Sequence, residues 1–332
     1  MTSVLDLLKI VYIAVRVIIA VVGFAVTKRT PFYPYLGMRR LHVLSRGVST
    51  RILASILSAE RRSEPTETTG GILGTLEPVE AKRLAQRIRQ DGFVVFESPL
   101  DPQLCDELER FARTTEARLT PPLPGGETIV YDPTDPRATR YDFSEQQLLR
   151  FPPVQRIAVD PSVRAVAQAY LQATPVNDMV AMWWTVAHGG VSSEAAQMFH
   201  YDLDRPRFLK FFIYLTDVTS DTGPHVFVRG THHGRPDPFY EDRRFTDEEV
   251  ADVFPDEAVT ELAGPRGTIM AVDTSGLHKG KHPGTGDRLV FQMEFSVSLF
   301  GVDYETLPRN ELVPEAAAEV DKSPKSFERF AS

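Results

Sequence analysis

The chain has 332 residues, enough for one large domain with additional segments or for two smaller domains. Its 42% hydrophobic and 25% charged residues exclude a disordered protein. The single cysteine, Cys105, excludes an intrachain disulfide and argues against a thiolate metal cluster, which favours a reducing compartment. Residues 1–62 hold ten Lys and Arg against two Asp and Glu, so the rest of the chain is strongly acidic. An acidic body argues against a nucleic-acid substrate, which would require a basic groove.

Residues 10–26 form a nearly unbroken apolar run, interrupted only by Arg16. As a helix, this run would be roughly 26 Å long, slightly short of the ~30 Å hydrocarbon core of a bilayer. In residues 38–57 apolar side chains recur every three or four residues between arginines, as in a helix on an anionic membrane surface. We therefore predict that residues 1–62 associate with a membrane surface or span it once. The cationic Lys28 and Arg29 would then place the remaining chain on the cytoplasmic side.

The alternative for residues 1–62 is that both helices pack on the body or on another subunit; the sequence predicts no oligomeric state. Residues 63–71 are polar and contain Pro and Gly, which indicates a linker. We expect the main domain at residues 72–310 and a C-terminal tail at residues 311–332. Helical patterns occupy residues 78–89, 103–119 and 161–171, a strand covers residues 94–96, and a long loop covers residues 120–136.

From residue 179 onward, short β-rich runs alternate with turn residues, as an antiparallel double-sheet jelly roll requires. The predicted strands cover residues 179–186, 197–202, 208–216, 225–228, 260–262, 268–272 and 289–297. We therefore predict a mostly β fold, a double-stranded β-helix of the jelly-roll, cupin-like type, with flanking and N-terminal helices. In such a fold, residues far apart in sequence meet at one site.

An H-x-D triplet at residues 200–202 provides the clearest chemical signal. Because residues i and i+2 of a strand point the same way, His200 and Asp202 can share a metal ion while Tyr201 faces elsewhere. His278 is the third candidate ligand, and His282 is its competitor only four residues later. Two imidazoles and one carboxylate leave coordination positions open, which suits a non-haem Fe(II) that binds a co-substrate and O₂.

Further segments surround these ligands in a fixed order: Asp91–Phe96, Leu100–Pro102, Gln197 with the H-x-D pair, Phe211–Val218, Gly223-Pro224, Gly230–His232, Gly267-Thr268, His278 and Arg288. From about residue 91 to about residue 300 the chain resembles the phytanoyl-CoA dioxygenase family. The resemblance implies a jelly-roll enzyme that uses Fe(II), 2-oxoglutarate and O₂. It also implies catalytic metal ligands at His200, Asp202 and His278, a carboxylate anchor at Arg288 and a co-substrate contact at Gln197, for which an ordinary structural amide is the alternative.

The resemblance also bears on the reaction and on the substrate. Halogenating members of the family leave the position of Asp202 without a carboxylate, so hydroxylation of an unactivated C–H bond is expected. Desaturation, epimerisation or ring formation at the same metal site is the alternative reaction. A further alternative is that the protein is a non-catalytic binding or scaffold protein. Trp184, Arg140 and Tyr141 are candidate contacts to a small-molecule or lipid-like substrate, with a loop salt bridge as the alternative for Arg140. No concentrated basic patch is expected in the acidic part, which argues against a CoA thioester.

Overall fold

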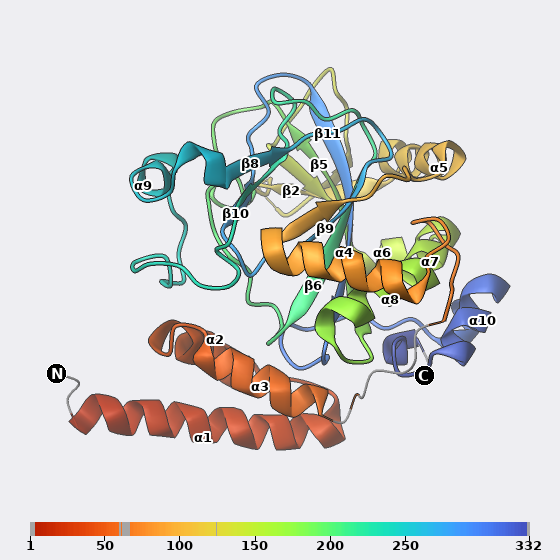
Figure 1. The fold of residues 1–332 in the computed structure, drawn as a ribbon. Helices are drawn as coiled ribbons and strands as arrows, with labels where there is room; N and C mark the ends of the chain where they lie inside the picture. The colour runs from red at the N-terminus through yellow and green to blue at the C-terminus, as the bar shows by residue number, and fades with distance from the viewer. Residues whose placement is uncertain (1–3, 60, 62–66, 124, 331–332) are drawn as a thin grey trace.

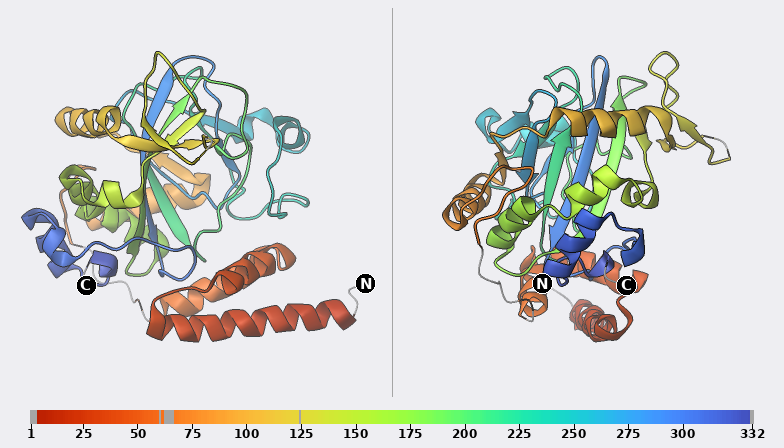
Figure 2. Two further views of the ribbon diagram at one scale, coloured as in Figure 1. Left: turned by 180° about the vertical axis from the view of Figure 1, so that it is seen from behind. Right: turned by 90° about the vertical axis from the view of Figure 1, so that its right-hand side faces the viewer.

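The computed structural model describes residues 4–59, 61, 67–123 and 125–330. Three N-terminal helices lie along one side of a larger body, and we call them the N-terminal platform. Helix α1 (Val4–Thr27) is outermost, while α2 (Phe32–Leu44) and α3 (Val48–Ser58) lie between it and the body (Figure 1, Figure 2). The helix predicted over residues 38–57 is therefore divided in two. Gly47 separates the halves with a φ of 81°, a left-handed conformation that favours glycine and ends a helix.

The body contains two antiparallel sheets. Among the described residues, the larger sheet has eight strands in the order β1-β9-β6-β11-β5-β4-β2-β3, and the smaller has three in the order β10-β7-β8. The strands are β1 (Phe93–Val95), β2 (Glu116–Thr120), β3 (Thr128–Val130), β4 (Arg140–Asp142), β5 (Val176–Val186), β6 (Phe208–Tyr214), β7 (His225–Val228), β8 (Val259–Leu262), β9 (Ile269–Val272), β10 (His278–Gly280) and β11 (Asp287–Ser296). This arrangement confirms the predicted jelly-roll fold.

The main core lies between the large sheet and the helices beside it (Figure 1). The helical elements are α4 (Pro78–Asp91), α5 (Pro102–Thr114), α6 (Glu145–Leu149), α7 (Pro152–Ala158), α8 (Pro161–Leu171), α9 (Asp247–Ala251) and α10 (Pro314–Lys322), with 3₁₀ turns at Asp256–Ala258, Arg309–Glu311 and Glu328–Phe330. Phe327 and Phe330 are buried in this core, so the segment predicted as a C-terminal tail packs against the body.

The alternation along β11 determines which side chains reach the space between the sheets. Leu289, Phe291 and Met293 belong to the main core on the helix side. Arg288 and Val290 face the opposite side, where they line a cavity. Because β11 is paired on both edges, with β5 and with β6, these positions are held rigidly in the middle of the sheet.

Some predicted boundaries were wrong. The helix predicted at residues 103–119 ends at Thr114, and residues 116–120 form strand β2, because the β-branched pair Thr114-Thr115 favours extended backbone. The predicted loop at residues 120–136 contains strand β3. The segment predicted as a strand at residues 197–202 makes only isolated pairings. Of the predicted linker, residues 63–66 lie outside the described residues, whereas Thr69 pairs with Leu76.

The platform is attached to the body along one side. Val17, Ala20 and Phe24 of α1 pack in an apolar cluster with Leu299 and Phe300 of the body. The platform carries most of the exposed large apolar side chains of the described chain, among them Leu8, Val11, Ile18, Ile19, Val22, Val26, Phe32, Tyr33, Ile52 and Ile56. The sequence left open the alternative that these helices pack on the body. The structure shows such packing for the side of the platform that faces the body. Residues Leu8–Thr27 are long and apolar enough to cross a membrane.

Candidate active site

Three side chains converge in the space between the two sheets. One nitrogen from each of His200 and His278 and one carboxylate oxygen of Asp202 lie within 4.8 Å of one another. Nε2 of His200 is 3.7 Å from Oδ1 of Asp202, and Nε2 of His278 is 3.5 Å from Oδ2. The structure thus brings together the three residues that the sequence predicts as metal ligands.

Backbone hydrogen bonds hold these three residues in register. The amide of His200 donates to the carbonyl of His278 at 2.9 Å, and the amide of His278 donates back to the carbonyl of His200 at 2.8 Å. The amide of Asp202 donates to the carbonyl of Thr274 at 2.8 Å. Two segments far apart in sequence are therefore locked side by side, with both imidazoles on one side.

The tautomer of each imidazole follows from its other nitrogen. Nδ1 of His200 lies 2.9 Å from the carbonyl oxygen of Met198, and Nδ1 of His278 lies 3.0 Å from that of Gly276. Because a carbonyl oxygen can only accept, Nδ1 carries the proton and Nε2 presents its lone pair to the cavity. Burial lowers the pKa of both histidines, so both are neutral and able to bind a metal ion.

The carboxylate of Asp202 is kept ionised by Lys210. Burial alone would raise the pKa of Asp202, but the charge of Lys210 and the two neighbouring imidazoles outweigh it and lower the pKa. Nζ of Lys210 donates to Oδ2 of Asp202 at 2.8 Å and to Oδ2 of Asp204 at 2.7 Å. Sequence reasoning missed Lys210, although a lysine inside the otherwise apolar strand β6 was a usable signal. Two neutral nitrogens and one anionic oxygen fit Fe(II).

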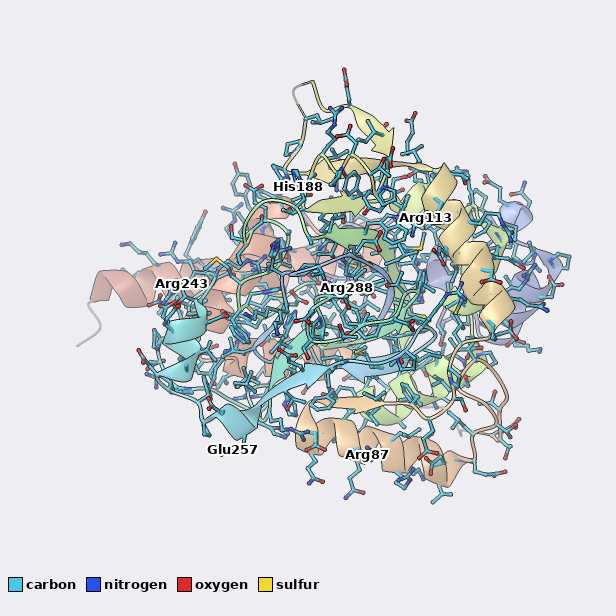
Figure 3. All side chains as sticks on the ribbon, turned by 90° about the horizontal axis from the view of Figure 1, so that it is seen from above. Arg87, Arg113, His188, Arg243, Glu257 and Arg288 are labelled. Carbon is cyan, nitrogen blue, oxygen red and sulfur yellow. The ribbon has the colours of Figure 1, made fainter. Side chains whose placement is uncertain are left out.

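Arg288, at the start of β11, fits the predicted role of carboxylate anchor. Its guanidinium donates to the carbonyl of Gly223 and to Oγ1 of Thr185. It forms no ion pair with any described residue, and its Nε has no hydrogen-bond partner among them. Burial lowers its pKa to about 10, which shows how strongly the site penalises an uncompensated cation. Arg288 lies near the middle of the body, whereas Arg87 and Arg113 lie toward its edge (Figure 3).

These residues line one cavity of about 420 Å³. Trp183, Phe212 and Val290 provide apolar lining, and two arginines, Arg118 and Arg244, approach the cavity from β2 and from the loop before α9. Arg140 also lines it and carries the salt bridge considered as its alternative, 2.6 Å from Asp142. No hydrogen bond or ion pair joins the side chain of Arg118 or Arg244 to the described part of the chain. Both are free to meet a ligand.

Three predicted contacts are placed elsewhere by the structure. Trp184 and Tyr141 are paired across β4 and β5 and face the main core, where Trp184 donates to the carbonyl of Ala112. The neighbouring Trp183 lines the cavity instead. The side chain of Gln197 accepts hydrogen bonds from Ser192 and lies 3.1 Å from Nδ1 of His282, outside the cavity lining. The contact with Gln197 also holds His282, the competing ligand, apart from the three converging donors.

A protein-family model described as phytanoyl-CoA dioxygenase matches residues 88–288, more than half of the chain. The chain belongs to the phytanoyl-CoA dioxygenase family. It is therefore a non-haem iron, 2-oxoglutarate-dependent oxygenase, and Fe(II), 2-oxoglutarate and O₂ are its cofactors, as the sequence predicts. The converging His-Asp-His donors and the uncompensated Arg288 are the groups that such cofactors need.

Several solved structures are similar to this member of the family. The epimerase SnoN in complex with Fe³⁺, alpha-ketoglutarate and nogalamycin RO has 20% identity and a TM-score of 0.48, over 66% of this chain and 84% of SnoN. EctD from S. alaskensis, in its apo form, has 18% identity and a TM-score of 0.47, over 71% of this chain and 80% of EctD. HygX from Streptomyces hygroscopicus, with nickel, 2-oxoglutarate and hygromycin B bound, has 14% identity and a TM-score of 0.45, over 68% and 90%. No match was found among curated proteins.

Proposed function

We propose that this enzyme hydroxylates an unactivated C–H bond of a small-molecule or lipid-like substrate and converts 2-oxoglutarate to succinate and CO₂. One observation carries the proposal: the donors of His200, Asp202 and His278 converge beside a buried arginine that has no carboxylate partner among the described residues. When bound, Fe(II), 2-oxoglutarate and O₂ supply an oxidant able to abstract hydrogen from such a bond.

Each residue then has a defined task. His200 and His278 offer Nε2 lone pairs and Asp202 offers a carboxylate oxygen, while Lys210 occupies Oδ2 of that carboxylate. Arg288 pairs with the far carboxylate of 2-oxoglutarate through its planar fork. Trp183, on the cavity wall, helps to exclude water from the reacting centre. The carboxylate of Asp202 fills the position that a halide would need, which supports oxygenation over halogenation.

Succinate release tests the site directly. Purified enzyme supplied with Fe(II), 2-oxoglutarate and O₂ should release succinate, and His200→Ala and Asp202→Ala should abolish that release. His282→Ala is the matched control, because His282 lies near the cavity but bonds to Gln197, and it should retain turnover. Equal turnover by His200→Ala would overturn the assignment. Product mass then separates hydroxylation, which adds one oxygen, from desaturation, epimerisation or ring formation, which add none.

The charged side chains that line the cavity indicate which chemical groups the substrate carries. Arg118 and Arg244 present cationic groups to it that no described residue neutralises, and Glu194 adds an anionic one. A substrate with a polar or anionic group at the mouth and an aliphatic carbon near the donors fits this lining.

We further propose that the platform lies in the plane of a membrane surface, on the cytoplasmic side. Its outer side is apolar, with Ile18, Val22 and Val26 more than 60% exposed, and the cations Arg16, Lys28 and Arg29 border it. Aromatic side chains Tyr12, Phe32 and Tyr33 suit the interfacial region. The in-plane placement is favoured over a span because Val17, Ala20 and Phe24 of α1 pack against Leu299 and Phe300 of the body.

Vesicle flotation tests this placement. The full chain should float with vesicles that contain phosphatidylserine, and the double variant Ile18→Glu, Val22→Glu should remain in solution. Val79→Glu is the matched control, because Val79 is equally exposed but lies on α4, away from the platform. A concentration-dependent dimer that the double variant abolishes, without any flotation of the unaltered chain, would show instead that a second copy covers the apolar side.

A further inference from the structure

A second cavity of about 420 Å³ lies between the N-terminal platform and the body. It shares no lining residue with the active-site cavity, among the residues that the structure describes. We call it the basic cavity, because six arginines line it against a single acidic side chain, Asp273. The arginines are Arg46 and Arg51 from the platform and Arg89, Arg205, Arg207 and Arg235 from the body.

Carboxylates of the described residues form ion pairs with two of these six cations. Arg205 pairs with Asp178 at 2.6 Å, and Arg46 pairs with Asp237 at 2.5 Å. The other four, Arg51, Arg89, Arg207 and Arg235, have no carboxylate within ion-pair distance in the described ranges. Asp273 acts electrostatically on Arg235, and its carboxylate accepts from the hydroxyl groups of Tyr170 and Ser275, so it offsets at most one of these four charges.

The uncompensated arginines lie close together. Arg89 and Arg207 both donate to the carbonyl oxygen of Tyr170, at 2.9 and 3.2 Å, so two guanidinium groups meet at one acceptor. Burial, and then the neighbouring charge of Arg207, lower the pKa of Arg89. Like charges held this close repel one another, and an anion between them would remove that repulsion.

Arg235 closes the cavity from the side of the metal ligands. Its guanidinium lies 3.7 Å from the ring centroid of Tyr201, the residue between His200 and Asp202, and it donates to the carbonyl of Ser275 at 2.6 Å. Its Nε has no hydrogen-bond partner among the described residues. The two cavities therefore lie on opposite sides of the segment that carries His200 and Asp202.

We infer that the basic cavity binds a phosphate-bearing anion. Planar guanidinium groups match the geometry of phosphate oxygens, and four of them exceed what a single carboxylate can satisfy. The cavity is larger than a phosphate group alone, so it has room for a phosphate ester. Two sources share this chemistry: a soluble phosphate ester and the headgroup of an anionic phospholipid.

Titration calorimetry of the full chain with inorganic phosphate and with glycerol 3-phosphate tests the site. We expect binding that weakens at least tenfold in the double variant Arg51→Gln, Arg207→Gln. Arg118→Gln is the matched control, because Arg118 is an equally unpaired arginine at the active-site cavity, and it should leave phosphate binding unchanged. No heat from the unaltered chain, or unchanged affinity in the double variant, would overturn the proposal. A loss on Arg118→Gln alone would do the same, since it places the phosphate in the active site.

The fold of the variants and the source of the phosphate need separate measurements. Arg51 is exposed and makes no side-chain hydrogen bond with a described residue, so Arg51→Gln alone should melt like the unaltered chain and still bind phosphate more weakly. Vesicles of phosphatidylcholine with phosphatidic acid are compared with vesicles of equal charge made with phosphatidylserine. A preference for phosphatidic acid that the double variant loses identifies a lipid headgroup. Binding of glycerol 3-phosphate without that preference identifies a soluble ester.

Discussion

Replacing Arg288 with lysine should weaken 2-oxoglutarate binding while leaving the metal site intact. Lysine keeps the positive charge but presents a point charge in place of a two-pronged fork, so one charge-assisted hydrogen bond to the far carboxylate is lost. Such a bond contributes about 1.5–3 kcal/mol. At about 1.4 kcal/mol per factor of ten, the dissociation constant should rise roughly ten- to a hundredfold.

Anaerobic titration with 2-oxoglutarate in the presence of Fe(II) measures this effect. Because Arg288 also donates to Gly223 and Thr185, a general disturbance of β11 must be separated from the loss of the anchor. 2-Oxovalerate, which has a methyl group in place of the far carboxylate, provides the separation: Arg288→Lys should reduce the preference for 2-oxoglutarate over it. Arg244→Gln, in the same cavity, should leave that preference unchanged. An unaltered preference in Arg288→Lys would refute the assignment of the anchor.

Two further predictions concern stability. Lys210→Met should lower the free energy of unfolding by about 3 kcal/mol, because it removes the cation shared by the half-buried Asp202 and Asp204 and the fully buried Glu294; urea unfolding checks this, and an unchanged midpoint would contradict it. Burial, and then Arg235, lower the pKa of His42 to about 3, with Arg39 and Arg51 acting in the same direction and Asp242 against them. The unfolded chain therefore binds a proton below about pH 6.5 that the folded chain does not, and stability falls as the pH drops from 6.5 toward 3. Between pH 6.5 and 5 the loss is about 2 kcal/mol, and His42→Asn should show a correspondingly smaller difference between melts at these two pH values.

The fold, and the convergence of the three candidate metal ligands, could be predicted from the sequence because both depend on local patterns. The i, i+2 spacing of His200 and Asp202 identifies a shared side of an extended segment, and short β-rich runs with turn residues identify the jelly roll. In the structure this segment pairs with its neighbours only at isolated positions. Residue propensities for β-structure do not distinguish such a segment from a regular strand.

The sequence could not show which side of a strand faces the cavity. Side chains alternate along a strand, so Trp183 and Trp184 are predicted to face opposite sides of the sheet. Which of the two lines the cavity depends on which side of the sheet the helices cover, and the sequence does not show this. The pairing of Tyr141 with Trp184 and of Asp142 with Trp183 shows that the choice extends across two strands. Because the orientation of the paired strands β4 and β5 was unknown, the predictions for Trp184 and Tyr141 failed together.

The basic cavity escaped sequence reasoning for a different reason. The sequence indicates no concentrated basic patch in the acidic part, whereas folding gathers four arginines of that part, from α4 and two separate loops, beside Arg46 and Arg51 of the platform. Arg46 and Arg51 stand in the basic N-terminal part of the sequence, whereas the four arginines of the body are dispersed through the acidic part. Only tertiary folding brings Arg89 and Arg207 to one carbonyl oxygen.

The reciprocal amide hydrogen bonds between His200 and His278 have a consequence for metal loading. They hold the two segments at a fixed spacing through the main chain, and the Nδ1 contacts with Met198 and Gly276 orient the two imidazoles. Ion capture then requires little loss of conformational entropy, unlike in small domains that fold only around their metal. The enzyme should therefore keep its fold when a chelator removes the iron, and iron should return to a site whose geometry is already set.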